Sequence, residues 1–178
     1  DFPESKLTSI PQDLDRGETC EIVPGHSLKP FLGPFGNGRT HNGIVVFSSK
    51  THISSAAFLE ENEVSLKFFA EVLEHLCTKV FGLKLDSIAI YHDPAGKSIA
   101  FNSNRSLHFN FRFFHALHFL QNKHETSECY SYWYVTQCHE LSHNFVSAHN
   151  REHGFYTEAF STKYFPKLVA LLRSLNIE

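Results

Sequence analysis

The sequence predicts an α+β domain that consists of a core helix, a three-stranded, mainly antiparallel sheet and two further helices. Two observations predict this class. Apolar residues recur at helical spacing over about residues 55–81, and again from residue 131 onward. Between these segments lie short apolar runs bounded by turn residues, and the run at residues 107–113 alternates between apolar and polar side chains. Such alternation is typical of an antiparallel strand with one buried face.

The composition indicates one globular domain of ordinary size. Of the 178 residues, 42% are hydrophobic and 20% are charged, which is enough apolar material for a core. The 18 phenylalanines predict that aromatic rings dominate this core. The net charge of −3 and the lack of any run of basic residues argue against a nucleic-acid partner for this segment. The sequence has neither a membrane-spanning stretch nor a signal-peptide pattern, so no membrane partner is expected.

The composition changes near residue 43. Residues 1–43 are rich in Pro and Gly and predict an irregular N-terminal arm, whereas residues 44–178 predict the folded domain. The arm could be a flap, a prosegment or a tether; a connector packed by Phe31, Leu32 and Phe35 is the simpler interpretation. Because the chain has no Met, even at position 1, we expect it to be a piece of a longer protein.

Each element of the domain has its own signal. Residues 44–47 are a short apolar run that predicts a buried strand, and Gly82 is expected to end the helix over residues 55–81. The three strands of the sheet are expected at residues 88–91, 99–102 and 107–113, the last with Leu107, Phe109, Phe111 and Phe113 on its buried face and His108, Asn110 and Arg112 on its polar face.

Two helices are expected to complete the domain after a polar loop at residues 121–129. The first begins at Ser131, and the second runs from about Arg151 to Ser174. Asn150 is the predicted N-cap of the second helix. Pro166 is expected to kink or break it, because proline removes a backbone donor and clashes with the preceding turn.

The cysteines lie far apart, without any CxxC pair. This pattern predicts free thiols in a reducing compartment, and therefore an intracellular protein of the cytoplasm or nucleus. Cys138 is expected in the core, since on a helix it points about 100° away from the adjacent His139. Cys20 could instead plug a metal site through its thiolate. The remaining two cysteines are Cys77 and Cys129.

The segment CHELSHNFVSAHNREH, residues 138–153, carries the chemistry. His139 and His143 are four residues apart, so on a helix both imidazoles lie on one face and can bind the same ion. Glu140 completes the pattern HExxH, in which the glutamate is the general base that acts on a metal-bound water. One Zn²⁺ per chain is the predicted cofactor, although nickel or cobalt also suits such ligands.

The third ligand is predicted to be His149. It lies six residues after His143 and cannot share its helix face, so the chain must turn back, which we expect at residues 147–148. His153, one turn further on, and Glu158, on the last predicted helix, are alternative third ligands.

The stretches IAFN, LHFNFRFF, YWYVTQCHELSH and AHN occur in an order that resembles small zincins of the SprT/Spartan type. The resemblance implies a zincin-like fold in which His139, His143 and His149 bind zinc and Glu140 is the general base. It also implies that residues 107–113 form an edge strand that pairs with an extended substrate, with His108, Asn110 and Arg112 nearest to it.

Two departures from that family concern the third ligand. Relatives usually have Gly or Gly-Pro before the third histidine, where this chain has Ser147 and Ala148, and they often have an aromatic residue where it has His153. A metzincin is excluded, because Val146 stands at the required glycine and the chain has no Met. The chain is also similar to a C-terminal segment of large sacsin-like proteins that bear a GHKL-type ATPase domain.

The leading prediction is a zinc-dependent metallopeptidase domain of a larger parent chain, with a protein or peptide as its substrate. The alternative is an inactive zincin-like scaffold that serves as an interaction module. Binding of both His149 and His153 would favour the scaffold, since structural zinc sites are closed and catalytic ones keep an open position. A non-peptide metal hydrolase is a third option. Tyr156 could donate a hydrogen bond to an oxyanion, or it could pack in the core.

Overall fold

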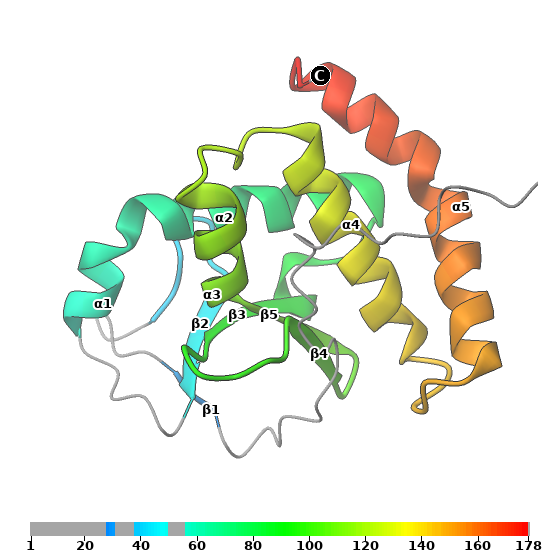
Figure 1. Cartoon of the computed structure of the whole chain (residues 1–178), viewed down its shortest axis with the longest axis horizontal. Coiled ribbons are helices and arrows are strands. Elements are labelled where there is room, and N and C mark those ends of the chain that lie inside the picture. Colours follow the sequence, from blue (N-terminus) through cyan, green and yellow to red (C-terminus); the bar gives the residue numbers. More distant parts are fainter. Residues whose placement is uncertain (1–27, 31–37, 50–55, 178) are drawn as a thin grey trace, which may run out of the picture.

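Helices and strands form an α+β arrangement in the computed structural model, which describes residues 28–30, 38–49 and 56–177 (Figure 1). The broad fold class is therefore as predicted. The strands are β1 (Leu28–Pro30), β2 (Val45–Ser49), β3 (Ile88–His92), β4 (Ala100–Ser103) and β5 (Ser106–Asn110). The helices are α1 (Ala56–Glu61), α2 (Glu63–Glu74), η2 (His75–Val80), η3 (Leu85–Ser87), α3 (Phe111–Phe114), η4 (His115–Phe119), α4 (Ser127–Ser142) and α5 (Arg151–Ser174).

The sheet has five strands rather than three, in the order β1-β2-β3-β5-β4, and it is mixed rather than mainly antiparallel. Strand β3 runs parallel to both of its neighbours, β2 and β5, while the β1–β2 and β4–β5 pairs are antiparallel. The apolar run at residues 44–47 does form a strand, as predicted, but that strand belongs to the same sheet as the others. The prediction was wrong because local patterns do not report which strands become neighbours after a helical crossover.

Strand β5 is shorter than predicted, and it does not lie at an edge of the sheet. It pairs with β3 on one side and β4 on the other, so β4 is the edge strand at this end. The chain leaves β5 at Asn110, whose side-chain oxygen accepts a hydrogen bond from the backbone N–H of Arg112 at 3.2 Å and caps α3. Phe111 and Phe113 are buried, but on a helix. The alternation was misleading because the end of a strand and the following helical turn bury apolar residues in the same order.

The polar residues of this segment make internal contacts instead of facing a substrate. The ring of His108 stacks on that of Phe101, with 4.5 Å between centroids. Asn110 is fully buried, and its amide donates a hydrogen bond to the carbonyl of Ser98 at 3.0 Å. Arg112 donates to two backbone carbonyls in the turn between β3 and β4. The implied substrate-facing role of these three side chains is therefore not supported by their positions.

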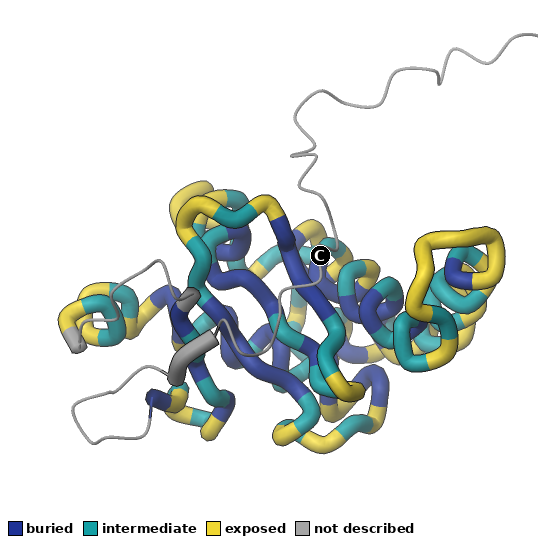
Figure 2. The backbone as a smooth tube through the Cα atoms, turned by 90° about the horizontal axis from the view of Figure 1, so that it is seen from below, coloured by how far each residue is buried: buried dark blue, intermediate teal, exposed yellow. Residues whose placement is uncertain are grey.

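The core is aromatic, as predicted, and it is centred on Trp133 of α4. The Trp133 ring lies 4.7 Å from that of Phe69 and 6.0 Å from that of Phe109, measured between centroids. Phe69 in turn stacks on Phe114 at 4.5 Å. These rings join α2, α3 and α4 to the sheet, and the buried stretches run through the middle of the molecule in Figure 2. The helix that carries the HExxH pattern is therefore anchored in the core.

Part of the predicted irregular arm belongs to the fold. Residues 28–30 form β1, which pairs with β2. The side-chain amide of Asn42 donates to the carbonyl of Ala70 at 3.0 Å and to a carboxylate oxygen of Glu74 at 2.8 Å, which fastens the turn before β2 to α2. The proposed packing residues and the proposed thiol plug of the arm lie outside the described residues: Phe31, Leu32, Phe35 and Cys20.

The two C-terminal helices are present with altered boundaries. Helix α4 begins at Ser127, earlier than predicted, because Thr126 caps it by accepting a hydrogen bond from the Cys129 N–H at 3.3 Å. Helix α5 begins after Asn150, as predicted. Pro166 was expected to kink or break it. The helix does not break there, since it continues through that residue, and its last turns are held by the buried side chains Leu168 and Leu171.

Three thiols lie inside the described fold. Cys77, Cys129 and Cys138 are buried and unbridged, which agrees with the prediction of free cysteines and with the core position of Cys138. None of the described helices is both long enough and apolar enough to cross a bilayer.

Candidate metal centre

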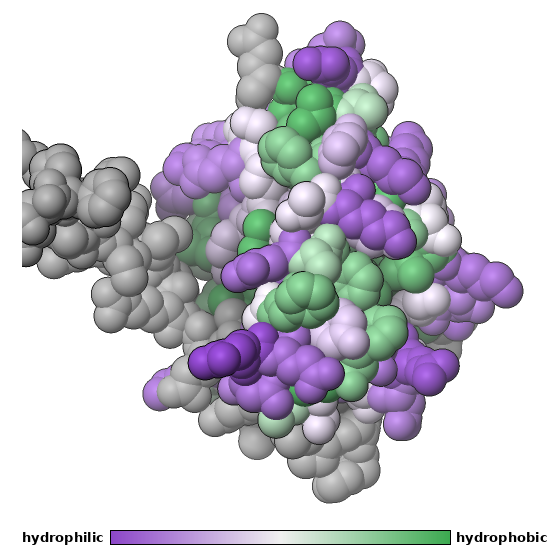
Figure 3. Space-filling model, turned by 90° about the vertical axis from the view of Figure 1, so that its right-hand side faces the viewer, coloured by the Kyte–Doolittle hydropathy of each residue, from purple (hydrophilic) through white to green (hydrophobic). Residues whose placement is uncertain are grey.

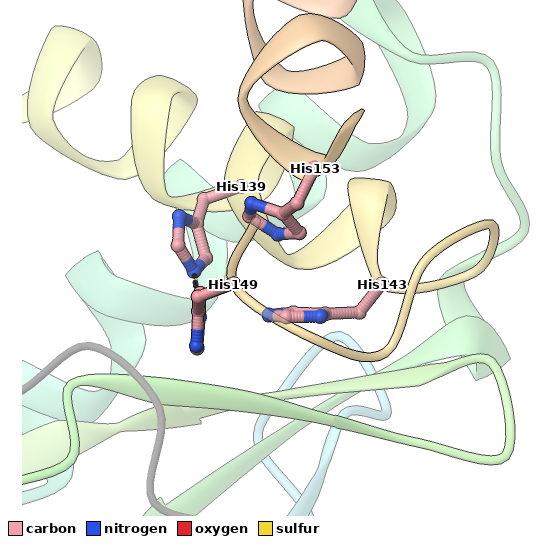
Figure 4. Close-up of side chains that lie close together, drawn as sticks. All are labelled: His139, His143, His149 and His153. Carbon is pink, nitrogen blue, oxygen red and sulfur yellow. Dashed lines mark hydrogen bonds between the residues drawn. The ribbon is translucent and has the colours of Figure 1, made fainter. Parts of the chain in front are cut away.

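Four histidines meet where α4 ends and α5 begins (Figure 4). Each offers a ring nitrogen, and these nitrogens all lie within 4.8 Å of one another, close enough to hold a metal ion. Two come from the HExxH pattern, one from the connecting loop and one from the first turn of α5. They are His139, His143, His149 and His153.

Local signals in the sequence explain how the chain brings these rings together. His139 lies in the last turn of α4 and His143 at its C-cap, so the two rings project from one face, with 5.2 Å between their centroids. The chain then leaves the helix and turns back to Asn150. The side chain of Asn150 accepts a hydrogen bond from the His153 N–H at 3.0 Å, which starts α5 and sets His153 against α4.

His153 lies closest to the HExxH pair. Its ring centroid is 4.5 Å from that of His139 and 4.2 Å from that of His143. The corresponding distances of His149 are 5.1 Å and 4.8 Å. His153 is also only 4% exposed, whereas His149 lies on the surface. Among the described residues, Nε2 of His153 is buried without a hydrogen-bond partner, so its lone pair is available to a metal.

His149 nevertheless fits the same centre. Its Nε2 lies 3.1 Å from Nε2 of His139 (Figure 4). Two nitrogens that bind one tetrahedral zinc at about 2.0–2.1 Å lie about 3.3–3.4 Å apart. The observed separation is thus close to that of two ligands on one ion.

The orientation of His143 is fixed by its second ring nitrogen. Nδ1 lies 3.1 Å from the carbonyl oxygen of Val146. Because a carbonyl can only accept a hydrogen bond, Nδ1 must carry the proton, and Nε2 is left with a lone pair for the metal. Metal-binding histidines typically have such a partner on the nitrogen that does not bind.

Burial lowers the pKa of three of the clustered imidazoles, which favours their neutral form. Burial lowers the pKa of His139 to about 3, with further lowering from the neighbouring histidines. Burial also lowers the pKa of His143, against the opposing effect of the Val146 carbonyl, and that of His153. Neutral imidazoles are the form that binds metal, so these residues are ready ligands at neutral pH. Imidazole nitrogen suits zinc, copper, iron and nickel alike.

Glu140 is not one of the clustered ligands. Its side chain is fully buried, and its charge contributes to raising the pKa of Tyr91, for which burial is the main cause. The backbone carbonyl of Glu140 accepts a hydrogen bond from the side-chain amide of Asn102 at 2.8 Å, and the same amide donates to Oδ1 of Asn144 at 2.8 Å. Asn102 lies on β4, so it fastens the edge strand to the end of the HExxH helix.

A second polar contact holds α5 against α4 beside the cluster. The hydroxyl of Thr157 donates to the hydroxyl of Ser142 at 3.0 Å, and the Ser142 hydroxyl donates to the carbonyl of Cys138 at 2.8 Å. Tyr134 of α4 reaches across to the carbonyl of Ser161 on α5. These contacts keep the two halves of the histidine cluster together.

The structure brings together the three predicted ligands and adds the fourth. His153, considered only as an alternative, joins them, and its spacing of four residues from His149 repeats that of the HExxH pair. Glu158 is exposed and lies outside the cluster. Tyr156 is half-buried and stacks on Phe145 at 5.0 Å rather than in the core.

The role of Asn102 was missed in the sequence. Its contacts with Glu140 and Asn144 span 38 and 42 residues, and no local pattern signals them.

Comparisons with known proteins identify no relative. The chain matches no protein-family profile, no curated protein and no solved structure. The resemblance to small zincins therefore stays a prediction, and the function must be inferred from the site.

Proposed function

We propose that this chain is a zinc-dependent metallopeptidase domain. The observation that carries the proposal is the HExxH pattern at the end of α4, whose two histidines meet two further histidines across the α4–α5 turn. The burial of His153 and its unpartnered Nε2 support metal binding, because a buried lone pair needs a partner.

Each residue has a defined part in this proposal. His139, His143 and His153 hold the ion from the two helices, and Glu140 is the general base. When bound, zinc would supply a water whose pKa is lowered to about 7. Glu140 would accept a proton from the attacking water and return it to the leaving amine nitrogen, so that the proton is conserved over the cycle.

A catalytic centre needs an open position, so one of the four histidines must give way to water and substrate. The position of His153 favours it as a permanent ligand, since it is buried and fixed by the Asn150 cap. His149 is exposed and lies on the loop, which makes it the exchangeable ligand. This differs from the sequence-based prediction, in which His149 was the third ligand.

A second candidate is a closed four-histidine zinc centre in an inactive interaction module. It is favoured by the same geometry, because all four ring nitrogens lie within 4.8 Å of one another. A structural zinc site is closed by four protein ligands, and such a site would stabilise the α4–α5 turn without any chemistry.

The test compares metal content and peptide cleavage in the same proteins. Elemental analysis of purified wild type should give one zinc per chain, and His143→Ala and His153→Ala should lose it, whereas His149→Ala should retain it. Cleavage of an unfolded protein such as reduced casein, followed by mass spectrometry, should occur in wild type. It should fall by at least about 10³-fold in Glu140→Gln, which keeps the metal.

Three outcomes contradict parts of the proposal. If wild type binds zinc but neither wild type nor His149→Ala cleaves the substrate, the closed, structural centre is favoured. Loss of zinc in His149→Ala but not in His153→Ala restores His149 as the third ligand. Absence of zinc after supplementation overturns both candidates.

The cellular context is part of the proposal. Three buried free thiols favour a reducing compartment, so we place the protein in the cytoplasm or nucleus. Its substrate would be a protein or peptide.

A further inference from the structure

Most residues of helix α5 are accessible to solvent, although several of them are aromatic. Only three of its 24 residues are buried: His153, Leu168 and Leu171. The helix contacts α4 through Thr157 and Ser161, and Figure 2 shows the α4–α5 turn and the start of α5 as largely exposed. The first turns of α5 are nevertheless rich in aromatic residues. A helix that presents apolar side chains to solvent is typical of an interaction site.

The aromatic residues form a continuous strip, which we define as Phe145, Phe155, Tyr156 and Phe160. The ring of Tyr156 is in contact with the other three, with centroids 5.0 Å from Phe145, 5.7 Å from Phe155 and 6.5 Å from Phe160. Two of its rings are open to solvent, since Phe145 is 62% exposed and Phe155 is 64% exposed. Figure 3 shows hydrophobic side chains gathered on this side of the molecule among hydrophilic ones.

The strip is continuous with the histidine cluster. Phe145 lies in the loop between two of the histidines, and Tyr156 lies about one turn after His153 on α5. Phe155 also forms one wall of a shallow depression, whose other lining residues are Asn150, Arg151 and Glu152 at the start of the helix. A chain bound across the metal centre would therefore reach the strip within a few residues.

The geometry points to a polypeptide segment as the occupant. We propose that the aromatic strip docks an extended, unfolded segment of the substrate that carries large apolar side chains. This inference rests on the proposed function and names its substrate class. Exposed rings on a rigid helix suit such a segment, because they bury apolar area at little cost in side-chain entropy. A natively folded protein buries most of its large apolar side chains, so it offers the strip fewer of them than an unfolded segment does.

The experiment measures binding separately from cleavage. The probe is a fluorescein-labelled peptide of about 12 residues with three Phe in a Gly-Ser background, which spans about 40 Å when extended. A matched peptide carries Ser in place of the three Phe. Binding is followed by fluorescence anisotropy with Glu140→Gln protein, which cannot cleave the probe if the proposed function holds, and whose side chain lies outside the strip.

The chain offers a matched control within the same helix. Phe165 is 56% exposed, close to Phe145 and Phe155. It lies ten residues after Phe155, which is about 15 Å along the helix axis, and about 180° around the helix from Tyr156. Phe165→Ser therefore removes an equally exposed ring without touching the strip. The test variant is the double change Phe145→Ser and Phe155→Ser.

The double variant should bind the Phe peptide at least about tenfold more weakly, while Phe165→Ser should bind within about twofold of its parent. The Ser peptide should bind weakly to all three. In the otherwise wild-type background, the double variant should also cleave the Phe peptide with a raised KM and an unchanged kcat. Equal binding by the double variant and Phe165→Ser would overturn the proposal.

Two further results separate this inference from its alternatives. If wild type sediments as a dimer and the double variant as a monomer, with no peptide binding by either, the strip is a contact between copies of this chain and the proposal fails. If the peptide binds through the strip but wild type never cleaves it, the docking surface is real and the metallopeptidase function is what has failed.

Discussion

Helices α4 and α5 each carry part of the histidine cluster, but the molecule holds them in different ways. Eight of the 16 residues of α4 are buried, including Trp133 at the centre of the aromatic core. Only three of the 24 residues of α5 are buried, and one of them is the metal-ligand candidate His153. One half of the site is therefore built on the core, and the other half is docked onto it (Figure 1).

This difference assigns separate tasks to the two helices. Burial on α4 fixes the positions of the HExxH pair, which a site needs if its ligands are to be preorganised. Helix α5 contributes His153 and most of the aromatic strip, and polar contacts of Thr157 and Ser161 hold it against α4. Metal binding should therefore stabilise the first turns of α5 more than α4, and the exposed rings Phe145 and Phe155 should matter for binding rather than for folding.

The largest expected effect tests the core half. Trp133→Ala should lower the free energy of unfolding by about 3–5 kcal/mol, because it removes a fully buried ring that contacts three helices and the sheet. Phe155→Ala on α5 should change it by less than about 0.5 kcal/mol. Urea unfolding of both variants at about pH 7.5, where histidines are mostly neutral, measures the difference. Comparable losses would mean that α5 is as much a part of the core as α4.

Metal removal should act mainly on α5. Chelation should speed backbone hydrogen exchange in residues 151–157, while the buried turns of α4 change little. With free zinc at 100 times its Kd, the metal should add about 2.7 kcal/mol to the free energy of unfolding. His153→Ala provides the control, since its exchange should already be fast and should not respond to chelation. If chelation accelerated hydrogen exchange equally in α4 and α5, the metal would not stabilise α5 more than α4.

Acid should lower the free energy of unfolding through His118. This residue is 2% exposed and packs against Tyr132 and Trp133 of α4. Burial is the main cause that lowers its pKa from 6.5 to about 4. Above pH 6.5 both folded and unfolded chains are neutral here, so the residue has no effect. As the pH falls from 6.5 towards 4, only the unfolded chain gains a proton, and stability is lost.

The expected loss from His118 is about 2 kcal/mol at pH 5. His118→Phe keeps a ring in the same place but removes the titration. Urea unfolding of wild type and this variant at pH 5 and at about pH 7.5 should therefore show a smaller decline for the variant by that amount. An identical decline would mean that the imidazole is not held neutral by its burial.

The smallest expected effect tests the contact between the two helices. Thr157→Val removes the hydrogen bond to Ser142 without changing the size of the side chain, so it should cost about 1 kcal/mol and weaken zinc binding a few-fold. Thr136→Val is the matched control, since the Thr136 hydroxyl donates only within its own helix, to the carbonyl of Tyr132 at 2.9 Å. Competition for zinc with a chromophoric chelator measures the affinities. Similar effects of the two changes would show that the contact does not position α5.

The candidate site could be predicted from the sequence further than the fold could. His139 and His143 were predictable because helical spacing alone puts them on one face, and the start of α5 was predictable because Asn150 is a local cap. The choice between His149 and His153 could not be made, since both follow a turn whose path is set by how α5 packs on α4. The contact of Asn102 with the motif joins residues 38 positions apart and has no local signal.

For the strands, too, local features were predictable and long-range pairing was not. Their existence at residues 44–47, 88–91 and 99–102 was predictable from short apolar runs, but their order was not, because pairing depends on crossovers through α1 and α2. The predicted strand at 107–113 failed at Asn110, where a buried side chain caps a helix that the alternation concealed.

By itself, the sequence determined the α+β class, the aromatic core, the HExxH helix and the cap of α5, because each depends on neighbours within a few residues along the chain. Only the tertiary structure decided that the sheet is mixed, that β4 rather than β5 is an edge strand, that His153 joins the other histidines and that the aromatic strip is partly open to solvent. Each of these depends on which distant segments pack together, and that choice is made by burial of the whole core rather than by any local pattern.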